Sequence, residues 1–322
     1  MKRQMIAAMM TLGLAGGIAL AGPASAQDRC DRKCLTGKLD QFLNAVVAKD
    51  PARANLWVGF RQTQNAQLTH QGEGIWKTNT GIGTIDRRYY DADTSQAEFY
   101  GTIREGDKTA VVSLRLKIGY GGQVTEAEWH VARAGDPGIM GEGSRATFDL
   151  DNLIRNPPAQ RTVPVAQRAP REQLIAAVNS YFDGIVAQTG RHVQANPGCL
   201  RFENGMGGQD WNKKPAPPAD ADFQTNTDCR SGYASLNIVN VAARRYLMVD
   251  AEAQIVVAST IFMREPLNPK RRNCFMEVFY MDNGKISSVY AAMAYVDARL
   301  PVPNWEPYEG NFPIPQSLIN AR

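Results

Sequence analysis

The stretch RFENGMG, Arg201 to Gly207, has a looser counterpart in the first half of the chain, RQTQNAQ, at Arg61 to Gln67. With an offset of 204 − 65 = 139 residues, Asn65 falls on Asn204. The same offset matches the apolar faces of two helix-like segments, pairing Leu39 with Val178, Phe42 with Tyr181 and Val46 with Ile185. Because this apolar pattern holds without a gap, the repeated phrase predicts two copies of one fold.

Each copy begins with an amphipathic helix and continues with strand-like runs, and Asn283-Gly284 marks a two-residue hairpin in the second copy. This order is typical of an α+β fold. We therefore predict two α+β domains packed against each other through their sheets. Their boundaries are expected at 27–154 and 173–298, with a Pro-rich linker or ordered strap at 155–172 and a Pro-rich C-terminal strap at 299–322 that packs on the body.

The composition and the first residues indicate an exported protein. Residues 1–26 read as a cleavable signal peptide, and no later stretch reaches the roughly 20 apolar residues of a spanning helix. We expect a periplasmic or secreted protein without a membrane anchor. The formal net charge of +4 falls to 4 − 2 = +2 without Lys2 and Arg3, and the other basic residues are scattered, so nucleic acid is not an expected partner.

The five cysteines of an exported chain are first interpreted as disulfide candidates. A local bridge fits Cys30 and Cys34 at the start of a helix-like segment, and a bridge between Cys199 and Cys229 would close a loop. Cys274 is left over in an apolar, strand-like run, which favours an inert thiol over a nucleophile. The chain has no CxxC pair, no ligand spacing among its three histidines and no nucleotide-binding motif, so neither a metal nor a cofactor is expected.

Several stretches resemble a family of exported fungal and bacterial proteins whose domain is uncharacterised in most members. They are CDRKCLTGKLDQFLNAVVAKDPAR, LRLKIGYGGQVTEAEWHVAR, CLRFENG, ADFQTNTDC and ARRYLMVDAEAQIVV. This family resembles the SnoaL-like and nuclear-transport-factor-2-like folds, which implies a cone: a curved antiparallel sheet wrapped around helices, with a pocket inside. The resemblance also implies cysteines at the positions of Cys199 and Cys229, which supports their pairing.

The cone superfamily includes polyketide cyclases, dehydratases, ketosteroid isomerases and non-catalytic binding modules, so the fold does not determine the reaction. More distantly, the chain is similar in superfamily to the sphingomonad lyases that release formaldehyde from lignin-derived aromatic dimers without a cofactor. None of their catalytic motifs matches this chain residue by residue. The resemblance therefore implies a class of chemistry and no active-site residue.

A hairpin around Gly119 to Gly122 carries polar residues on one face. Pairing Ile118 with Gln123 would set Arg115 opposite Glu126, Ser113 opposite Glu128 and Val111 opposite His130. As a pocket wall, this face would use His130 or Glu128 to remove a proton and Arg115 to stabilise negative charge. Alternatively, Arg115 belongs to a cross-strand ion pair on an exposed or domain-facing surface. Both interpretations stay open.

Aromatic and polar residues elsewhere suit a phenolic ligand. Tyr89 and Tyr90 place phenols on both faces of one strand, and Trp76 precedes them, although most aromatic residues form the core. In the second copy, Arg201 and Asn204 are candidate substrate-binding residues. Glu203 is a candidate general base; alternatively, the phrase that contains it ties down a turn through hydrogen bonds.

The first functional hypothesis is a cofactor-independent lyase that dehydrates or deformylates a small aromatic, lignin-derived type of compound. The alternative is a non-catalytic module that binds an apolar or aromatic ligand outside the cytoplasm. A third hypothesis is a structural assembly protein whose cones are filled by side chains. Either of the first two predicts a small aromatic or apolar ligand as partner, and homodimer formation is left open.

Overall fold

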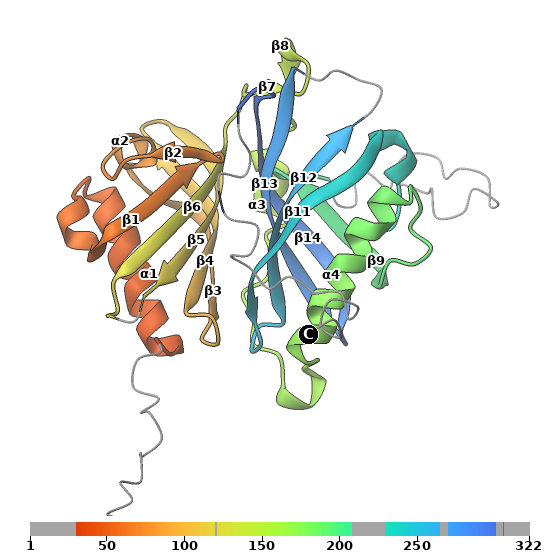
Figure 1. Ribbon diagram of the computed structural model, residues 1–322, viewed down its shortest axis with the longest axis horizontal. Coiled ribbons are helices and arrows are strands. Elements are labelled where there is room, and N and C mark those ends of the chain that lie inside the picture. Colours follow the sequence, from red (N-terminus) through yellow and green to blue (C-terminus); the bar gives the residue numbers. More distant parts are fainter. Residues whose placement is uncertain (1–29, 120, 208–228, 265–269, 301–304, 306–322) are drawn as a thin grey trace, which may run out of the picture.

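The computed structural model describes residues 30–119, 121–207, 229–264, 270–300 and 305, which leaves the predicted signal peptide outside the described residues. These residues form two six-stranded sheets that face each other, and one long helix lies on the outer side of each sheet (Figure 1). Helix α1 (Arg32–Val47) covers the first sheet and helix α4 (Arg171–Val186) the second. The chain is therefore a mixed α and β protein built on two sheets.

The first sheet has the spatial order β2-β1-β6-β5-β4-β3. Its strands are β1 (Leu56–Gln64), β2 (Gln67–Thr69), β3 (Gly81–Asp91), β4 (Gln96–Glu105), β5 (Lys108–Ile118) and β6 (Val124–Ala132). Strands β3 to β6 follow one another as antiparallel neighbours. The apolar residues of α1 pack on one face of this sheet and form the first core.

The second sheet has the equivalent order β10-β9-β14-β13-β12-β11. Its strands are β9 (Ala195–Glu203), β10 (Met206–Gly207), β11 (Ile238–Asp250), β12 (Ile255–Arg264), β13 (Arg271–Asp282) and β14 (Lys285–Asp297). Each strand of the first sheet thus has one counterpart at the same place in the second sheet. The repeated order of elements matches the repeat expected from the sequence, while the domain boundaries stay predictions.

One pairing in each sheet is parallel, which corrects the expectation of wholly antiparallel sheets. Strand β1 runs parallel to β6, and β9 runs parallel to β14. The reason is that the first strand of each half enters the sheet beside the last strand of that half. The connections that permit this crossover include α2 (Ile75–Thr78) in the first half and η4 (Tyr233–Leu236) in the second.

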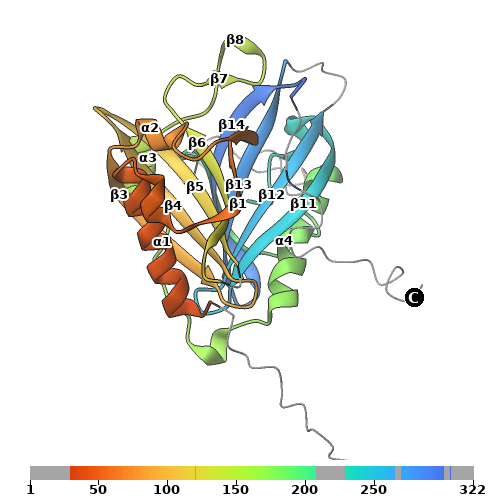
Figure 2. The same ribbon diagram turned by 60° about the vertical axis from the view of Figure 1, so that its left-hand side comes forward.

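The remaining short elements lie at the ends of the sheets and between the two halves. They are η1 (Pro51–Ala54), β7 (Pro137–Gly138), β8 (Gly141–Arg145), α3 (Leu150–Arg155) and η2 (Val165–Gln167). Turning the molecule shows α1 and α4 on opposite sides of the paired sheets (Figure 2). No helix among the described residues is long and apolar enough to cross a membrane.

A third core lies between the two sheets. It joins Tyr89 and Tyr100 of the first half to Leu247, Tyr280 and Tyr290 of the second. The rings of Tyr100 and Tyr290 meet edge to face with centroids 6.0 Å apart. The halves therefore pack through their sheets, as expected from the sequence.

The segment 155–172 is an ordered strap along this seam. Arg161 donates hydrogen bonds to the Asp282 carboxylate and to the Met281 carbonyl, and each donor–acceptor distance is 2.6 Å. The carbonyl of Ala159 accepts a hydrogen bond from the Tyr89 hydroxyl over 2.9 Å. The strap therefore contacts both halves directly.

Both expected disulfides are confirmed. Cys30 is bonded to Cys34, and Cys199 to Cys229. Cys274 is free and buried, and burial raises the pKa of its thiol to about 12, as an inert thiol requires. The two disulfides suggest an oxidising environment outside the cytoplasm.

Candidate functional site

The repeated phrase of the sequence shapes the fold in both halves. Asn65 and Asn204 both have left-handed backbones, with φ of 49° and 51°. The Asn65 side chain donates to the carbonyl of Val131 and accepts from its N–H, and Asn204 does the same with Met293, all over 2.7–3.0 Å. Each asparagine therefore extends the parallel ladder past the end of its strand, and Asn204 has a structural role.

The hairpin of the first half pairs in a different register from the one expected. Arg115 lies opposite Glu128, and Ser113 lies opposite His130. A bulge where Lys117 passes into Ile118, together with a longer loop, shifts the register by two residues. Because the shift is even, these side chains still share one face.

That face lies between the two sheets. Glu128 accepts two hydrogen bonds from Arg245 of β11, over 2.9 and 2.8 Å, and it lies 3.2 Å from Arg115 Nε. All three side chains are fully buried. Burial opposes the ionisation of Glu128, but Arg245 and Arg115 outweigh it and hold its pKa well below the usual range.

The neighbours of this ion cluster are also buried. His130 Nε2 lies 3.5 Å from Glu128 Oε1, and Glu98 accepts a hydrogen bond from Ser113. Burial raises the pKa of Glu98 to about 8, against the effect of that hydrogen bond. At pH 7 the cluster therefore combines a neutral acid, Glu98, with an ionised acid, Glu128, inside the seam.

Trp305 covers the cluster from the C-terminal strap, of which only Arg299, Leu300 and Trp305 are described. Its indole N–H donates to the Thr63 hydroxyl over 3.0 Å. The guanidinium carbons of Arg115 and Arg245 lie 5.0 and 5.9 Å from its ring centre. Since Trp305 is itself buried, the strap does pack on the body at this residue, and it screens the cluster from solvent.

The aromatic residues proposed for ligand binding in the first half also pack the protein. The Tyr89 hydroxyl lies 2.5 Å from the Tyr280 hydroxyl across the seam. The Trp76 indole is fully buried and donates to Gln62 over 2.8 Å, and Tyr90 belongs to the first core. These aromatic residues therefore serve packing, and Arg115, Glu128 and His130 belong to a buried ion cluster. The chemistry proposed below lies in the second half, away from these residues.

The interior of the second half differs from that of the first along one row of the sheet. In the first half the row across β4, β5, β6 and β1 is Phe99, Leu114, Trp129 and Gln64. In the second half the row across β12, β13, β14 and β9 is Ala258, Glu277, Ala291 and Glu203. Two large rings are thus replaced by alanine, and two carboxyl groups flank Ala291.

The equivalence of these rows rests on the repeated asparagines. The N–H of Asn65 donates to the carbonyl of Trp129, and the N–H of Asn204 donates to that of Ala291, over 2.8 and 3.0 Å. Side chains that fill the first interior therefore have polar or smaller counterparts in the second. The alanines beside Glu277 leave its carboxyl group with small neighbours on both sides.

Glu277 is the buried acid of this interior, with a relative exposure of 4%. Burial raises its pKa to about 8; Glu203 acts in the same direction, and Arg201 acts against it. Its Oε2 is buried and has no hydrogen-bond partner among the described residues. Glu277 therefore holds its proton at neutral pH and presents a donor or acceptor inside the second half.

Arg201 and Glu203 come together beside Glu277, with 3.9 Å between Arg201 Nε and Glu203 Oε1. The Glu203 side chain is 31% exposed. Burial opposes the charge of Arg201, but Tyr181 and Glu203 raise its pKa. Tyr181 of α4 packs edge to face on Tyr233, with ring centroids 5.8 Å apart, and burial raises its pKa. The interior thus contains an acid, a carboxylate, a cation and a phenol.

Unpartnered polar atoms mark the same interior. Arg201 Nη1 and Thr260 Oγ1, like Glu277 Oε2, are buried without a hydrogen-bond partner in the described part of the chain. Native proteins satisfy nearly all such atoms with protein groups or ordered water, so these three are positions where a water molecule or a polar ligand would bind. The seam holds atoms of the same kind on Glu98, Tyr100 and His130. The described residues contain no group of three or more side chains suited to hold a metal ion.

Sequence reasoning found Arg201 and Glu203 but missed Glu277, Tyr181 and the seam residue Arg245. The available signal for Glu277 was a single acid inside an otherwise apolar strand, NCFMEVFYM, because a glutamate is rarely buried without a function or a partner. The repeat pairs Tyr181 with Phe42 on the apolar face of a helix. The hydroxyl that Tyr181 adds to this apolar position was the signal of a polar role.

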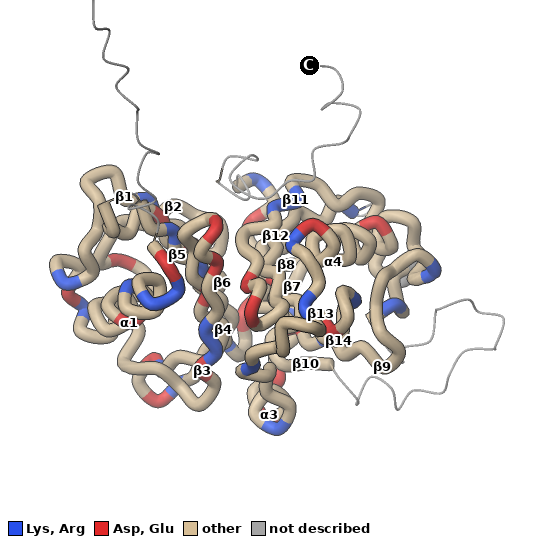
Figure 3. Tube along the Cα trace, turned by 90° about the horizontal axis from the view of Figure 1, so that it is seen from below, with Lys and Arg blue, Asp and Glu red and all other residues tan. Residues whose placement is uncertain are grey.

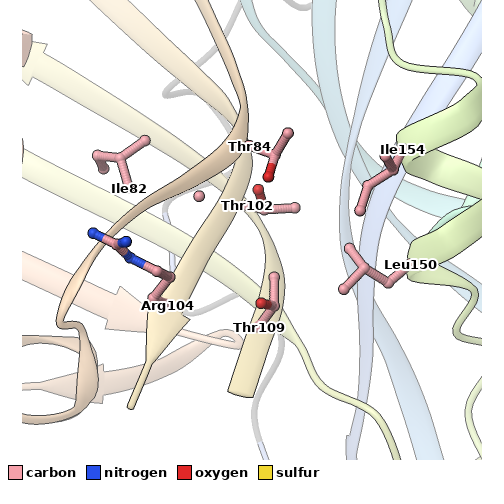
Figure 4. A pocket seen from close by; sticks show the side chains of 8 residues that line it. Ile82, Thr84, Thr102, Arg104, Thr109, Leu150 and Ile154 are labelled. Atoms are coloured by element: carbon pink, nitrogen blue, oxygen red, sulfur yellow. The ribbon is translucent and has the colours of Figure 1, made fainter. Parts of the chain in front are cut away.

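A separate groove of about 320 Å³ lies where the first sheet meets α3. Thr84, Thr102 and Thr109 line its sheet side, and Leu150 and Ile154 of α3 face them (Figure 4). Among the described residues that line it, Arg104 alone is ionisable. This groove can hold a small ligand but offers no acid–base pair.

Charged residues of both signs are spread over both halves in the described part of the chain (Figure 3). Acidic and basic side chains also pair with each other. Arg171 lies 2.7 Å from Asp91 across the seam, and Arg133 lies 2.6 Å from Glu105 within the first half. This mixed pattern does not form the one-sided basic surface of a nucleic-acid-binding protein.

Comparison with known proteins places the match in the second half. Residues 167–293 match the family model of a domain of unknown function, DUF8021, and this range contains the interior described above. A comparison with curated proteins gave no match. A protein of unknown function with a cystatin-like fold from Methylobium petroleophilum PM1 is similar over 44% of this chain and 99% of its own, with 17% identity and a TM-score of 0.30.

Proposed function

We propose that the second half is a cofactor-independent lyase. It removes water or formaldehyde from a small aromatic compound of the kind that is derived from lignin. Glu277 is its general acid and Glu203 its general base. The observation that carries this proposal is the row Ala258, Glu277, Ala291 and Glu203, where the first half has an apolar filling. A neutral acid in the same row as a partly exposed carboxylate, with only the small side chain of Ala291 between them, is the pairing that we propose for elimination chemistry.

In dehydration, the Glu203 carboxylate takes a proton from the carbon next to the leaving group. The C–H electron pair forms the new double bond, the C–O bond breaks toward oxygen, and Glu277 donates the proton with which the oxygen leaves as water. Arg201 stabilises the negative charge that develops on the substrate. A proton returned from Glu203 to Glu277 through solvent resets both groups.

In deformylation, Glu203 takes the proton of a hydroxymethyl group. The C–C bond then breaks, formaldehyde leaves, and the carbon that keeps the electron pair receives a proton from Glu277. The same two carboxyl groups therefore serve either elimination. Tyr181, next to Arg201, orients a phenolic oxygen of the substrate in both cases.

The proposal includes a finer description of the fold and location. Each half is interpreted as a cone of the SnoaL-like or nuclear-transport-factor-2-like type, with α1 or α4 inside the curve of its sheet. The protein is proposed to be periplasmic or secreted, in line with its two disulfides. The first cone serves as a filled structural partner of the second.

The test is a thermal-shift screen of the mature protein against phenolic monomers and dimers, followed by mass spectrometry of each mixture that shifts. A product lighter than the substrate by water or formaldehyde supports the lyase. Glu277→Gln should reduce turnover at least ~10²-fold while the protein stays folded. Glu98→Gln is the matched control, because Glu98 is also a buried acid with a raised pKa but lies in the seam. Full activity of the Glu277 variant would contradict the assignment.

The second candidate function is non-catalytic binding of an apolar or aromatic ligand. The groove between the first sheet and α3 favours it, since about 320 Å³ lies at the small end of ligand pockets and has no acid–base pair. Ligands that raise the melting temperature of the protein and whose mass is unchanged after incubation would support this function. Loss of that stabilisation on Thr102→Val, but not on Glu277→Gln, would locate the ligand in the groove.

A further inference from the structure

Arg264, the last residue of β12, is a partly buried cation without a carboxylate partner among the described residues. Its Nη1 donates to Asn273, and its Nε donates to the Leu236 carbonyl over 3.3 Å. Burial lowers its pKa, although Tyr295 and Glu203 act against this. A guanidinium that is partly removed from water and satisfied only by neutral groups favours an anion as its next neighbour.

The side chains between Arg264 and Glu277 are mostly aromatic and apolar, and Phe275, Met293 and Thr260 among them are buried. Phe262 and Phe275 lie on the inner face of β12 and β13, with ring centroids 4.7 Å apart. Met293 of β14 lies opposite Phe275, and it is buried. The unpartnered hydroxyl of Thr260 lies on the same face of β12. Side chains of these types are suited to contact a flat ring with one polar substituent.

The spacing along β13 sets the length of the ligand. Asn273, which binds Arg264, precedes Glu277 by four residues on the same face. At a rise of about 3.3 Å per residue, the two positions lie roughly 13 Å apart. This is the length of an acid that carries one or two aromatic rings.

We infer that the substrate of the proposed lyase is an aromatic carboxylic acid, whose carboxylate binds Arg264 and whose reacting carbon lies beside Glu277. The inference rests on the proposed function and adds the charge and the orientation of the substrate. The charges inside the second half agree with it, since Arg201 and Arg264 face one carboxylate, Glu203, when Glu277 is protonated. A bound carboxylate would balance them.

Isothermal titration calorimetry tests this inference with matched pairs of acids and carboxamides, such as 4-hydroxycinnamate and its amide, and the two-ring analogues of each. The parent protein should bind the acid at least ~10-fold more tightly than the amide. Arg264→Gln should remove this preference, and Arg264→Lys, which keeps the charge, should restore part of it. Arg244→Gln is the control, because Arg244 is an arginine of the same half that already pairs with Asp183.

Equal binding of acid and amide by the parent, or a preference that survives in Arg264→Gln, would overturn the inference. Failure of every acid in the panel to bind would overturn it too. None of these results removes the lyase itself, which depends on Glu277. If Glu277→Gln abolishes turnover of a neutral substrate while Arg264→Gln does not, the acid–base site stands and the anion site does not.

Discussion

Arg32, the first residue of α1, forms an ion pair with Asp250 at the end of β11 in the opposite half, with 2.9 Å between Nη1 and Oδ1. Arg171, the first residue of α4, forms the equivalent pair with Asp91 at the end of β3, over 2.7 Å. The two arginines are related by the sequence repeat, since 171 − 32 = 139. The two aspartates are 250 − 91 = 159 residues apart, but each is the last residue of the equivalent edge strand, β3 or β11. Such reciprocity is typical of a symmetric dimer interface, here formed within one chain.

The two aspartates should therefore contribute equally to stability. Asp250 also accepts a hydrogen bond from the N–H of Tyr90, and Asp91 accepts one from the N–H of Val249, both over 2.9 Å. Asp91→Asn and Asp250→Asn should each lower the free energy of unfolding by about 3 kcal/mol, measured by urea denaturation. The control Asp297→Asn, at an exposed pair, should leave stability unchanged. A large loss in only one of the two variants would contradict the reciprocal interface.

The repeated asparagines should also behave as a pair. Asn65→Ala leaves two backbone groups without their side-chain partner, and Asn204→Ala leaves three, because Asn204 also donates to the Thr147 carbonyl. Alanine also tolerates the left-handed backbone less well than asparagine, so each variant should lose about 2–3 kcal/mol of stability. Asn204→Gly relieves the backbone but not the lost hydrogen bonds, and it should lie between the parent and the alanine variant. A glycine variant as stable as the parent would show that the side-chain hydrogen bonds with Met293 contribute nothing.

The repeat was predictable because its signals are local. The apolar faces of the two helices and the phrases that contain Asn65 and Asn204 can be read directly from the chain. The parallel pairing of β1 with β6 was not, because it depends on which edge of the sheet β1 joins. The hairpin register failed for a related reason, since the bulge at Lys117 has no glycine or proline to reveal it.

The candidate site was only partly predictable. Arg201 and Glu203 stand out in the sequence because they are polar residues beside a turn. Glu277 becomes significant only when its row is compared with the row of Leu114, which requires the pairing of four strands. The network around Glu128 was predictable only as one of two alternatives, because a polar strand face does not reveal that Arg245 arrives from the other half.

The two disulfides should differ in their contribution to stability. The bond between Cys199 and Cys229 closes a separation of 30 residues, against 4 for Cys30 and Cys34. Loop entropy predicts a loss of roughly 3–4 kcal/mol when the longer bridge is removed by alanine substitution, and about 2 kcal/mol for the shorter one. Chemical denaturation of the two double variants measures both values. The reverse order would show that strain or residual structure outweighs loop entropy.

The pH dependence of stability should report on Glu277. Its pKa is about 8 in the folded protein, against an ordinary value of 4.5, so the folded state binds more protons between these values. The proton on Glu277 therefore stabilises the folded state at low pH. The free energy of unfolding falls as the pH rises from about 4.5 to 8, because the folded protein then loses this proton. Glu277→Gln removes this slope and should be more stable than the parent at pH 9.

Glu98 has a similar pKa and contributes a similar slope, so the parent curve alone does not isolate Glu277. The difference in melting temperature between the parent and Glu277→Gln, measured from pH 5 to pH 9, does isolate it. A difference that stays constant over this range would mean that Glu277 does not titrate there.

The most direct measurement is the titration of the Glu277 carboxyl group by carbon-13 NMR in the protein that lacks residues 1–26, assigned by the loss of its signal in Glu277→Gln. The account predicts a protonated carboxyl group at pH 7 with a midpoint near 8. It also predicts that a bound aromatic acid shifts this midpoint. A carboxyl group that is ionised throughout the neutral range would contradict the role of Glu277 as the general acid of the second half.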